Sequence, residues 1–239
     1  MGSSLLYHID YHIDVVFVVD SSGGMQPWMP QVEEFALRFL TALLDSGKET
    51  GKPISEVRAR IVDFSDYAFE GDDAIHQTEF FHIPAEAEKF DMAFRGIDCE
   101  ARGGDLPENG LEALYTAMNS DWCELKPGQR GRHIIVLISD GLPLDLQERA
   151  GMIGYPSDEM PECNAALETL WNFPLEYDLK LSTHMQRLLL FVPGGTDNSG
   201  HTWEWVADWP KTDIWEFQEL IGISDEMIKR LVRIVMGAY

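Results

Sequence analysis

Three aspartates and one serine are the side chains of this chain whose types and spacing could perform chemistry together. Asp20 and Ser22 belong to an Asp-Ser-Ser-Gly-Gly-Met loop that follows an apolar stretch, and Asp140 directly follows a second apolar stretch. A third acid, Asp105, lies in a Gly-Gly-Asp-Leu-Pro run just before a predicted helix. Carboxylate and hydroxyl oxygens suit a hard divalent cation, with Mg²⁺ as the first candidate and Mn²⁺ or Ca²⁺ as alternatives. Without a cation, three clustered carboxylates would repel one another, and one would take up a proton.

A simpler interpretation of the first loop stays open at this point. Ser22 or Asp20 could cap the helix that follows, so that the loop is only a turn between a strand and a helix. Gly23 and Gly24 fit both interpretations, because glycine permits a tight and unusual backbone path. The loop taken alone does not separate a cation site from a turn.

The elements that must position these residues follow from the hydrophobic pattern. Residues 13–19 and 132–139 are nearly unbroken apolar runs, which is typical of strands buried on both faces of a mostly parallel sheet. Further strands are predicted at 57–64, 78–83 and 187–192. Amphipathic helices are predicted at 32–46, 85–94, 108–118, 164–171 and from Ser224 to near Gly237. This alternation predicts one α/β domain over 13–239, preceded by an extended lead-in over 1–12.

The predicted sheet brings the acids together. In sheets of this class, ligands bind outside the carboxyl ends of the strands, at the point where the strand order reverses. Asp20 and Asp140 each end a central strand, and Asp105 begins a helix whose preceding loop lies at the same edge. We therefore expect the three carboxylates and the Ser22 hydroxyl to meet at one end of the sheet.

Composition excludes several classes of partner. The chain has 239 residues, of which 45% are hydrophobic, so it can bury a sizeable core. Acidic residues outnumber basic ones 41 to 18, giving a formal net charge of -23. That charge disfavours nucleic acid and anionic membrane surfaces, since both are bound through Lys and Arg. It favours partners that are cations or basic proteins.

The cysteines bear on the cellular compartment. Cys99, Cys123 and Cys163 are widely spaced and form no Cys-x-x-Cys pair, so neither a zinc knuckle nor a disulfide framework is indicated. No stretch has the pattern of a signal peptide or the length of a membrane span. These observations predict a reducing, cytoplasmic location.

Two further stretches have a specific interpretation. Residues 66–73 form an acidic run, but the EF-hand spacing would place Ala68 and Gln77 at ligand positions, so a solvated hairpin turn is expected. Residues 144–162 are rich in Gly and Pro and are expected to form a long functional loop. Four tryptophans crowd the region near the end of the chain, and packing is the favoured explanation for them. They are Trp203, Trp205, Trp209 and Trp215.

Three motifs together resemble a von Willebrand factor type A domain. They are Val-Val-Phe-Val-Val-Asp-Ser-Ser-Gly-Gly-Met from residue 15, Gly-Gly-Asp-Leu-Pro-Glu from residue 103 with Leu-Glu-Ala-Leu after it, and Ile-Val-Leu-Ile-Ser-Asp-Gly from residue 135. Their order and spacing cover roughly the whole chain, and the second motif is similar to the bacterial and intracellular branch of the family. The resemblance implies a Rossmann-like, three-layer αβα fold with a mostly parallel central sheet and one antiparallel edge strand.

The resemblance also implies a metal-ion-dependent adhesion site. In that family an Asp-x-Ser-x-Ser loop, a Thr and a second Asp hold a Mg²⁺-like ion, and a partner usually supplies the last ligand. Asp20, Ser22 and Asp140 match, while Asp105 stands where the family often has Thr and Gly24 stands where it has Ser. Three carboxylates around a divalent ion leave the site net negative, which weakens its attraction for an acidic partner. Recognition is therefore expected to depend more on the surrounding loops.

The function implied is a non-catalytic protein–protein interaction module, a cytoplasmic bacterial adaptor whose partner could be an AAA+ ATPase, a phosphatase or a kinase. The rim of its binding edge is predicted at Gln26, Trp28, Leu142, Asp145 and Thr196. Two alternatives stay open. A metal-dependent hydrolase or phosphatase would need a general base, for which His184 and His201 are the candidates. A scaffold that binds no metal is the other alternative, because of Gly24.

Overall fold

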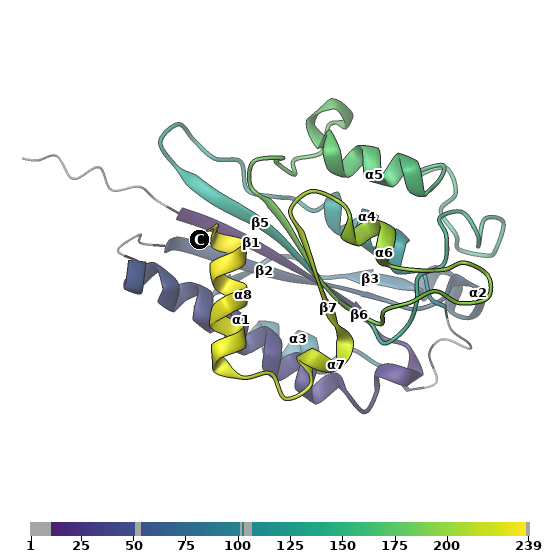
Figure 1. Ribbon diagram of the computed structural model, residues 1–239, viewed down its shortest axis with the longest axis horizontal. Coiled ribbons are helices and arrows are strands. Elements are labelled where there is room, and N and C mark those ends of the chain that lie inside the picture. The colour runs from purple at the N-terminus through teal and green to yellow at the C-terminus, as the bar shows by residue number, and fades with distance from the viewer. Residues whose placement is uncertain (1–10, 51–53, 101, 103–106, 238–239) are drawn as a thin grey trace, which may run out of the picture.

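The computed structural model describes residues 11–50, 54–100, 102 and 107–237, and its core is a seven-stranded sheet (Figure 1). The strands are β1 Tyr11–Asp20, β2 Ile54–Phe64, β3 Ile75–Gln77, β4 Phe81–Ile83, β5 Arg130–Ile138, β6 Gln186–Val192 and β7 Thr212–Glu216. Their order is β3-β2-β1-β5-β6-β7, with β4 also paired to β2. The pairs from β2 across to β7 are parallel, whereas β3 and β4 run antiparallel to β2. The predicted mostly parallel α/β fold is confirmed, and its antiparallel edge consists of two short strands.

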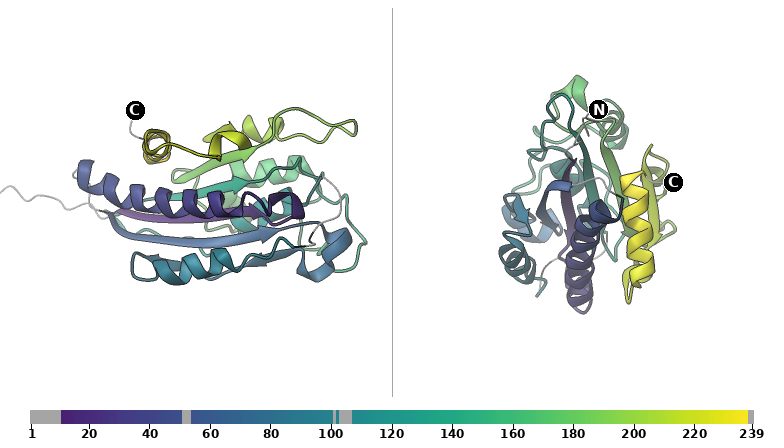
Figure 2. Two further views of the ribbon diagram at one scale, coloured as in Figure 1. Left: turned by 90° about the horizontal axis from the view of Figure 1, so that it is seen from below. Right: turned by 90° about the vertical axis from the view of Figure 1, so that its left-hand side faces the viewer.

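Helices cover both faces of the sheet and make three layers (Figures 1 and 2). The α-helices are α1 Met29–Thr50, α2 Tyr67–Glu70, α3 Ala87–Arg95, α4 Gly110–Met118, α5 Asn164–Asn172, α6 Glu204–Ala207, α7 Phe217–Leu220 and α8 Asp225–Met236. Short 3₁₀ turns are η1 Gly23–Met25, η2 Gly71–Asp73 and η3 Pro174–Tyr177. Helices α1, α3, α7 and α8 pack on one face, and α4, α5 and α6 pack on the other.

Strand β1 supplies side chains to both cores, because successive residues of a strand point to opposite faces. Phe17 packs against Phe39, Phe90 and Phe94 from α1 and α3, with ring centroids 5.8–6.5 Å apart. Val18 and its neighbours on the other face belong to the cluster that α4 and α5 cover. Burial on both faces explains the unbroken apolar run.

The strand order reverses between β1 and β5. From β1 the chain proceeds through α1 to β2 and the antiparallel edge, whereas from β5 it proceeds to β6 and β7 on the other side. The loops that leave the carboxyl ends of β1 and β5 therefore separate toward opposite sides, which opens the crevice where ligands bind in sheets of this class.

The structure corrects two predicted segments. Helix α1 runs through Gly47 to Thr50, beyond the predicted end at residue 46, because a glycine inside a helix costs only about 1 kcal/mol. The acidic run 66–73 connects two antiparallel strands, β2 and β3, so the predicted hairpin is confirmed, but the connection is formed by α2 and η2 and is not a solvated turn. Its first residue, Asp66, is fully buried and caps α2 by accepting the Ala68 amide at 2.8 Å.

The tryptophan-rich region is packed, as expected. Trp203 and Trp209 are buried in the core under α4 and α5, and Trp171 stacks on Trp209 at 5.9 Å. Strand β7, which lies in this region, is not predicted from the sequence. Among the residues that the structure describes, no helix is long and apolar enough to cross a bilayer.

Candidate metal site at the carboxyl edge of the sheet

Asp20 is held in one orientation by two neighbouring loops. It is the last residue of β1 and is fully buried. Its Oδ1 accepts the backbone amide of Ser22 at 2.8 Å, and its Oδ2 accepts the hydroxyl of Ser139 at 2.6 Å. Ser139 immediately precedes Asp140, so this hydroxyl links the end of β1 to the loop after β5. One hydrogen bond, from Ser139 to Asp20, therefore connects Asp20 to the residue that precedes Asp140.

Both carboxyl groups are shifted toward the protonated form. Burial raises the pKa of Asp20 to about 6, although the Ser139 hydroxyl and the Ser22 amide favour its charged form. The nearby charge of Asp140 contributes to this increase in the pKa of Asp20. Burial also raises the pKa of Asp140. A divalent cation between the two carboxylates would offset this cost, since an opposite charge favours the ionised state.

Two buried oxygens at this edge make no well-formed hydrogen bond to the described residues, although the Ser22 hydroxyl lies close enough to Asp20 to lower the pKa of that carboxyl. They are the hydroxyl oxygen of Ser22 and Oδ1 of Asp140. Ser22 is 3% exposed, and its side chain does not cap η1, so the alternative in which this serine is a helix cap is wrong. Buried polar atoms are nearly always paired, and an unpaired one costs about 1–3 kcal/mol. Two such oxygens on adjoining loops fit a hard cation.

Gly24 lets the Asp140 carboxylate lie directly against the first loop. A Cβ atom at residue 24 would be 2.6 Å from Oδ2 of Asp140, which is closer than real Cβ contacts. The carboxylate therefore occupies the space that a side chain at residue 24 would fill. Gly24 stands where the Asp-x-Ser-x-Ser motif has its second serine, and the missing side chain is what allows Asp140 to approach this loop so closely.

The Gly24→Ala variant is expected to move the Asp140 carboxylate and to weaken cation binding by about 10–100-fold. Its free energy of unfolding should change by less than about 1 kcal/mol, because the displaced group is the end of a side chain. Titration calorimetry with Mn²⁺ measures the affinity. Gly23→Ala is the matched control, since a Cβ there would meet, in the described part of the chain, only Arg102 O, at 3.5 Å, and Cys99 O, at 3.9 Å. Equal affinities for the two variants would contradict this role of Gly24.

The third predicted acid, Asp105, lies outside the described residues. Arg102, in the same stretch, is described, and its carbonyl accepts the Gly23 amide at 2.9 Å. Its guanidinium donates to Asp63 at 2.9 Å and to the carbonyl of Asp73 at 2.6 Å. Sequence reasoning missed Arg102, and its only signal was a basic residue beside the Gly-Gly pair.

The five predicted rim residues all follow the carboxyl end of a parallel strand. Gln26 and Trp28 follow β1, Leu142 and Asp145 follow β5, and Thr196 follows β6. All are exposed except Leu142, which is half-buried. The ring of Trp28 lies edge-on to Phe217 of α7 at 6.3 Å, and Asp145 accepts the side-chain amide of Asn164 at 2.6 Å.

His201 connects two of these loops. It is buried, and its Nδ1 faces Asp197 while its Nε2 faces Glu148, each at 2.8 Å. Both ring nitrogens are occupied by carboxylates, so His201 is not placed to act as a base toward Asp20. His184 is exposed and precedes β6, which puts it at the opposite end of the sheet. Neither candidate base of the hydrolase alternative is in position.

The pairing of His201 with Asp197 and Glu148 is expected to make the free energy of unfolding depend on pH. Burial of the ring opposes protonation, but the hydrogen bonds and charges of Asp197 and Glu148 outweigh it, so the pKa of His201 is raised. Because the pKa is higher in the folded than in the unfolded state, protonated His201 stabilises the fold fully at pH values below its unfolded-state pKa of about 6.5. This contribution is lost as the pH rises through the folded-state pKa.

Wild type should therefore exceed His201→Gln in free energy of unfolding by up to about 1 kcal/mol at pH 6, with the difference shrinking toward pH 9. Urea unfolding at several pH values measures it. His184→Gln, at an exposed position, serves as the control. A difference for His201→Gln that grows with pH would contradict the assignment.

A second group of residues of metal-binding type lies toward the amino end of the sheet, and its side chains are used in hydrogen bonds and an ion pair within the protein. Asp14, Cys123 and His133 offer ligand atoms within 4.8 Å of one another. Asp14, however, accepts Nε and Nη2 of Arg58 at 2.8 and 2.6 Å. The Ser182 amide points at Nδ1 of His133, so the ring proton belongs on Nε2, which faces the Cys123 carbonyl at 3.1 Å. Nε2 carries the proton, and the lone pair of Nδ1 already accepts the Ser182 amide, so neither ring nitrogen is available to bind a metal.

Comparison with known proteins supports the fold. No protein-family model matches the chain, and no curated protein matches it. Among solved structures, the pilus adhesin SpaC from Lactobacillus rhamnosus GG superposes with a TM-score of 0.57 at 12% identity, over 95% of this chain and 31% of that chain. Proximal thread matrix protein 1 from the mussel byssus gives 0.48 at 15% identity, over 95% and 49% of the two chains.

The vWF domain of the type V pili tip protein Mfa5 from Porphyromonas gingivalis gives a TM-score of 0.36 at 22% identity, over 56% of this chain and 39% of that one. The chain spans about a third of the length of SpaC, so the two proteins share one region. At these identities the likeness to SpaC establishes the three-layer α/β fold of the chain and nothing finer.

Proposed function

We propose that this chain is a non-catalytic protein-interaction module that holds a divalent cation at the carboxyl edge of its sheet. Asp20, Ser22 and Asp140 would supply ligands, and Asp105 is proposed as a further one from the sequence. The observation that carries the proposal is a pair of buried oxygens, Oγ of Ser22 and Oδ1 of Asp140, that make no well-formed hydrogen bond to the described part of the chain and lie beside the buried carboxylate of Asp20. The resemblance of the three motifs to a von Willebrand factor type A domain supports the same site.

The donor set favours Mg²⁺, with Mn²⁺ or Ca²⁺ as substitutes, because all proposed ligands are hard oxygens. Asp20 and Asp140 already neutralise a divalent ion, and Asp105 would make the site net negative. An acidic partner is therefore a poor last ligand for this site. We infer that recognition is carried by the rim residues, and that the charge of -23 directs the module toward basic partners.

A catalytic role has less support than a binding role. The candidate bases His184 and His201 are, respectively, at the other end of the sheet and occupied by carboxylates. SpaC, whose fold is similar, is a pilus adhesin, which agrees with an interaction role for this chain. A cytoplasmic location and a partner such as an AAA+ ATPase, a phosphatase or a kinase stay predictions from the sequence.

Affinity capture tests the role of the cation. Wild type, Asp140→Ala and Glu168→Ala, a control at an exposed acid of α5 outside the rim, would each be immobilised and exposed to a lysate of the source organism, with Mg²⁺ or with EDTA. We expect one protein to be retained by wild type and by Glu168→Ala in Mg²⁺, and to be lost with EDTA and with Asp140→Ala. A protein retained under all conditions would favour the metal-free scaffold. Turnover of phosphoesters that depends on Asp140 would favour the hydrolase.

A further inference from the structure

Two segments far apart in the sequence form one unit beside the candidate metal site. Residues 66–73 carry α2 and η2, and residues 144–162 follow β5 without a helix or strand of their own. At Gly154 the two backbones touch, since a Cβ atom there would overlap the backbone of Gly71 and Asp72. The ring of Tyr67 packs against that of Tyr155 at 5.0 Å.

Buried polar contacts anchor this unit to the body of the protein. Arg149 pairs with the buried carboxylate of Asp66, with Nε 2.8 Å from Oδ1. The Tyr155 hydroxyl donates to Oε1 of Glu112 in α4 at 2.8 Å, and it accepts the amide of Gln147 at 2.9 Å. The long segment is thus tied down along its length, so its outer surface has a defined shape.

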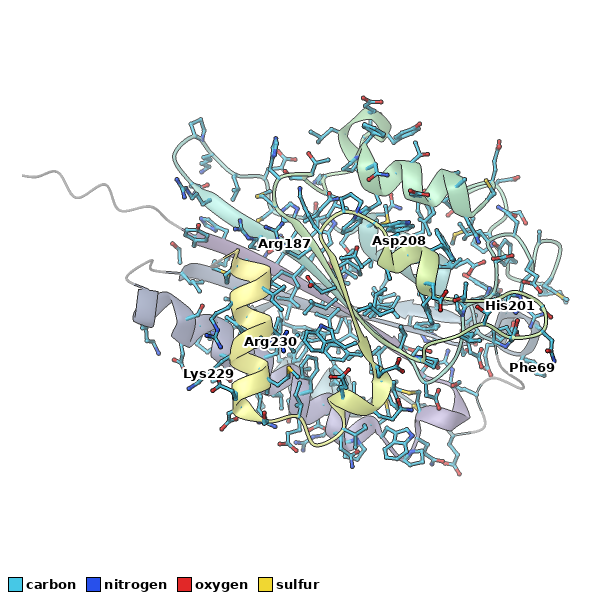
Figure 3. The ribbon with its side chains drawn as sticks, in the orientation of Figure 1. Phe69, Arg187, His201, Asp208, Lys229 and Arg230 are labelled. Atoms are coloured by element: carbon cyan, nitrogen blue, oxygen red, sulfur yellow. The ribbon has the colours of Figure 1, made fainter. Side chains whose placement is uncertain are left out.

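That outer surface presents large apolar side chains to solvent. Phe69 is 56% exposed, Met152 is 46% exposed and Ile153 is 87% exposed. Ile153 lies beside Gly71, two residues from Phe69, and Figure 3 shows Phe69 at the same end of the molecule as His201. We call Phe69, Met152 and Ile153 the apolar knob. Exposed apolar groups on an anchored surface add little to folding and are typical of binding sites.

The surroundings of the knob are acidic. Nine acidic residues lie in the two segments; one of them, Asp66, is buried and paired with Arg149, the one basic residue in the segments. From outside the segments, Arg102 donates to the carbonyl of Asp73. The acids are Asp66, Glu70, Asp72, Asp73, Asp145, Glu148, Asp158, Glu159 and Glu162. Such a field attracts Lys and Arg and repels phosphate groups, anionic lipid and a second copy of the same surface.

We propose that the apolar knob docks a basic amphipathic segment of a partner protein, in which Leu, Ile, Phe or Met side chains contact the knob and Lys or Arg side chains flank them. The inference rests on the proposed interaction role and names the chemistry of the partner. Apolar contact would supply affinity at the centre, and the acidic surround would select the sign of the partner's charge.

Synthetic peptides test this directly. The probe is a labelled peptide of about 18 residues with Leu at helical i, i+3, i+4 spacing and Lys elsewhere. One control peptide carries Glu in place of Lys, and another carries Ser in place of Leu. In fluorescence anisotropy at about 0.15 M salt, we expect the Lys/Leu peptide to bind at least about tenfold more tightly than either control.

Two double variants show where on the protein the Lys/Leu peptide binds. Phe69→Ser/Ile153→Ser should weaken the Lys/Leu peptide at least about tenfold, because two central apolar contacts are lost. Phe173→Ser/Leu175→Ser removes another exposed apolar pair, near η3, and should change the affinity less than about twofold. Circular dichroism checks that both variants are folded.

Each other result would overturn the proposal. No measurable binding of the Lys/Leu peptide, equal binding of the Glu/Leu peptide, or equal effects of the two double variants would each do so, as would self-association that Phe69→Ser/Ile153→Ser abolishes. Wild-type affinity for the Lys/Leu peptide should be the same with Mg²⁺ and with EDTA, because the knob does not use the cation site. A failure of the cation proposal and a failure of the docking proposal therefore give different results.

Discussion

Adding Mg²⁺ or Mn²⁺ to metal-free protein is expected to raise its melting temperature by about 5–10 °C when the free cation is at about 100 times its dissociation constant. A ligand that binds only the folded state stabilises it by about 2.7 kcal/mol at that concentration, and each kcal/mol is about 2–4 °C for a chain of this size. The effect should be large here because the cation would stabilise the charges of one buried and one half-buried carboxylate, Asp20 and Asp140. It would also be bound by the oxygens of Ser22 and Asp140, which make no well-formed hydrogen bond to the described residues. Differential scanning calorimetry measures the shift.

Asp140→Ala should abolish the shift, whereas Asp145→Ala, at an exposed acid close by, should keep it in full. Circular dichroism without cation separates a lost site from a lost fold. The Asp140→Ala protein should be folded, since removing a carboxylate beside Asp20 also removes a repulsion. A wild-type protein indifferent to both cations would contradict the site.

Arg149→Met is expected to lower the free energy of unfolding by about 3–5 kcal/mol, because it leaves the buried carboxylate of Asp66 without its counter-charge. Asp66 is fully buried and pairs with Arg149 through both carboxylate oxygens. The loss should also free the 144–162 segment from α2, so hydrogen exchange of that segment should accelerate. Urea unfolding followed by tryptophan fluorescence gives the free energy.

Asp66→Asn/Arg149→Met is the matched control. Asparagine can still accept the amide of Ala68 and cap α2, but it carries no charge that needs a partner. The double variant should therefore recover most of the stability lost in Arg149→Met. If Arg149→Met lay within about 1 kcal/mol of wild type, or if the double variant were as unstable, the pair would not be anchoring the segment.

Much of the fold could be predicted because its signals are local or run through the core. Strands β1 and β5 are buried on both faces, so their apolar runs are continuous. Helix α8 begins where Ser224 accepts the Met227 amide at 3.2 Å, and Gly237 at its end has a positive φ of 67°. Strand β7 could not be predicted, since Thr212–Glu216 is a mixed sequence that becomes a strand only by pairing with β6.

The candidate site could be predicted in outline only. The rule that parallel strands end at one edge places Asp20 near Asp140, and the structure joins them through Ser139. The close approach of Asp140 to Gly24 depends on side-chain positions that no local pattern specifies. The burial of Asp66 could not be predicted either, because Arg149, its partner, lies 83 residues away.

Diffraction from crystals grown in Mn²⁺ tests the central claim most directly, because the anomalous signal of manganese locates the ion without reference to its ligands. We expect one strong anomalous peak at the carboxyl edge of the sheet, within about 2.5 Å of Oγ of Ser22 and a carboxylate oxygen of Asp140. The same crystals of Asp140→Ala should lack it. Saturating Mn²⁺ with no peak between these loops, or a peak only elsewhere on the molecule, would contradict the claim.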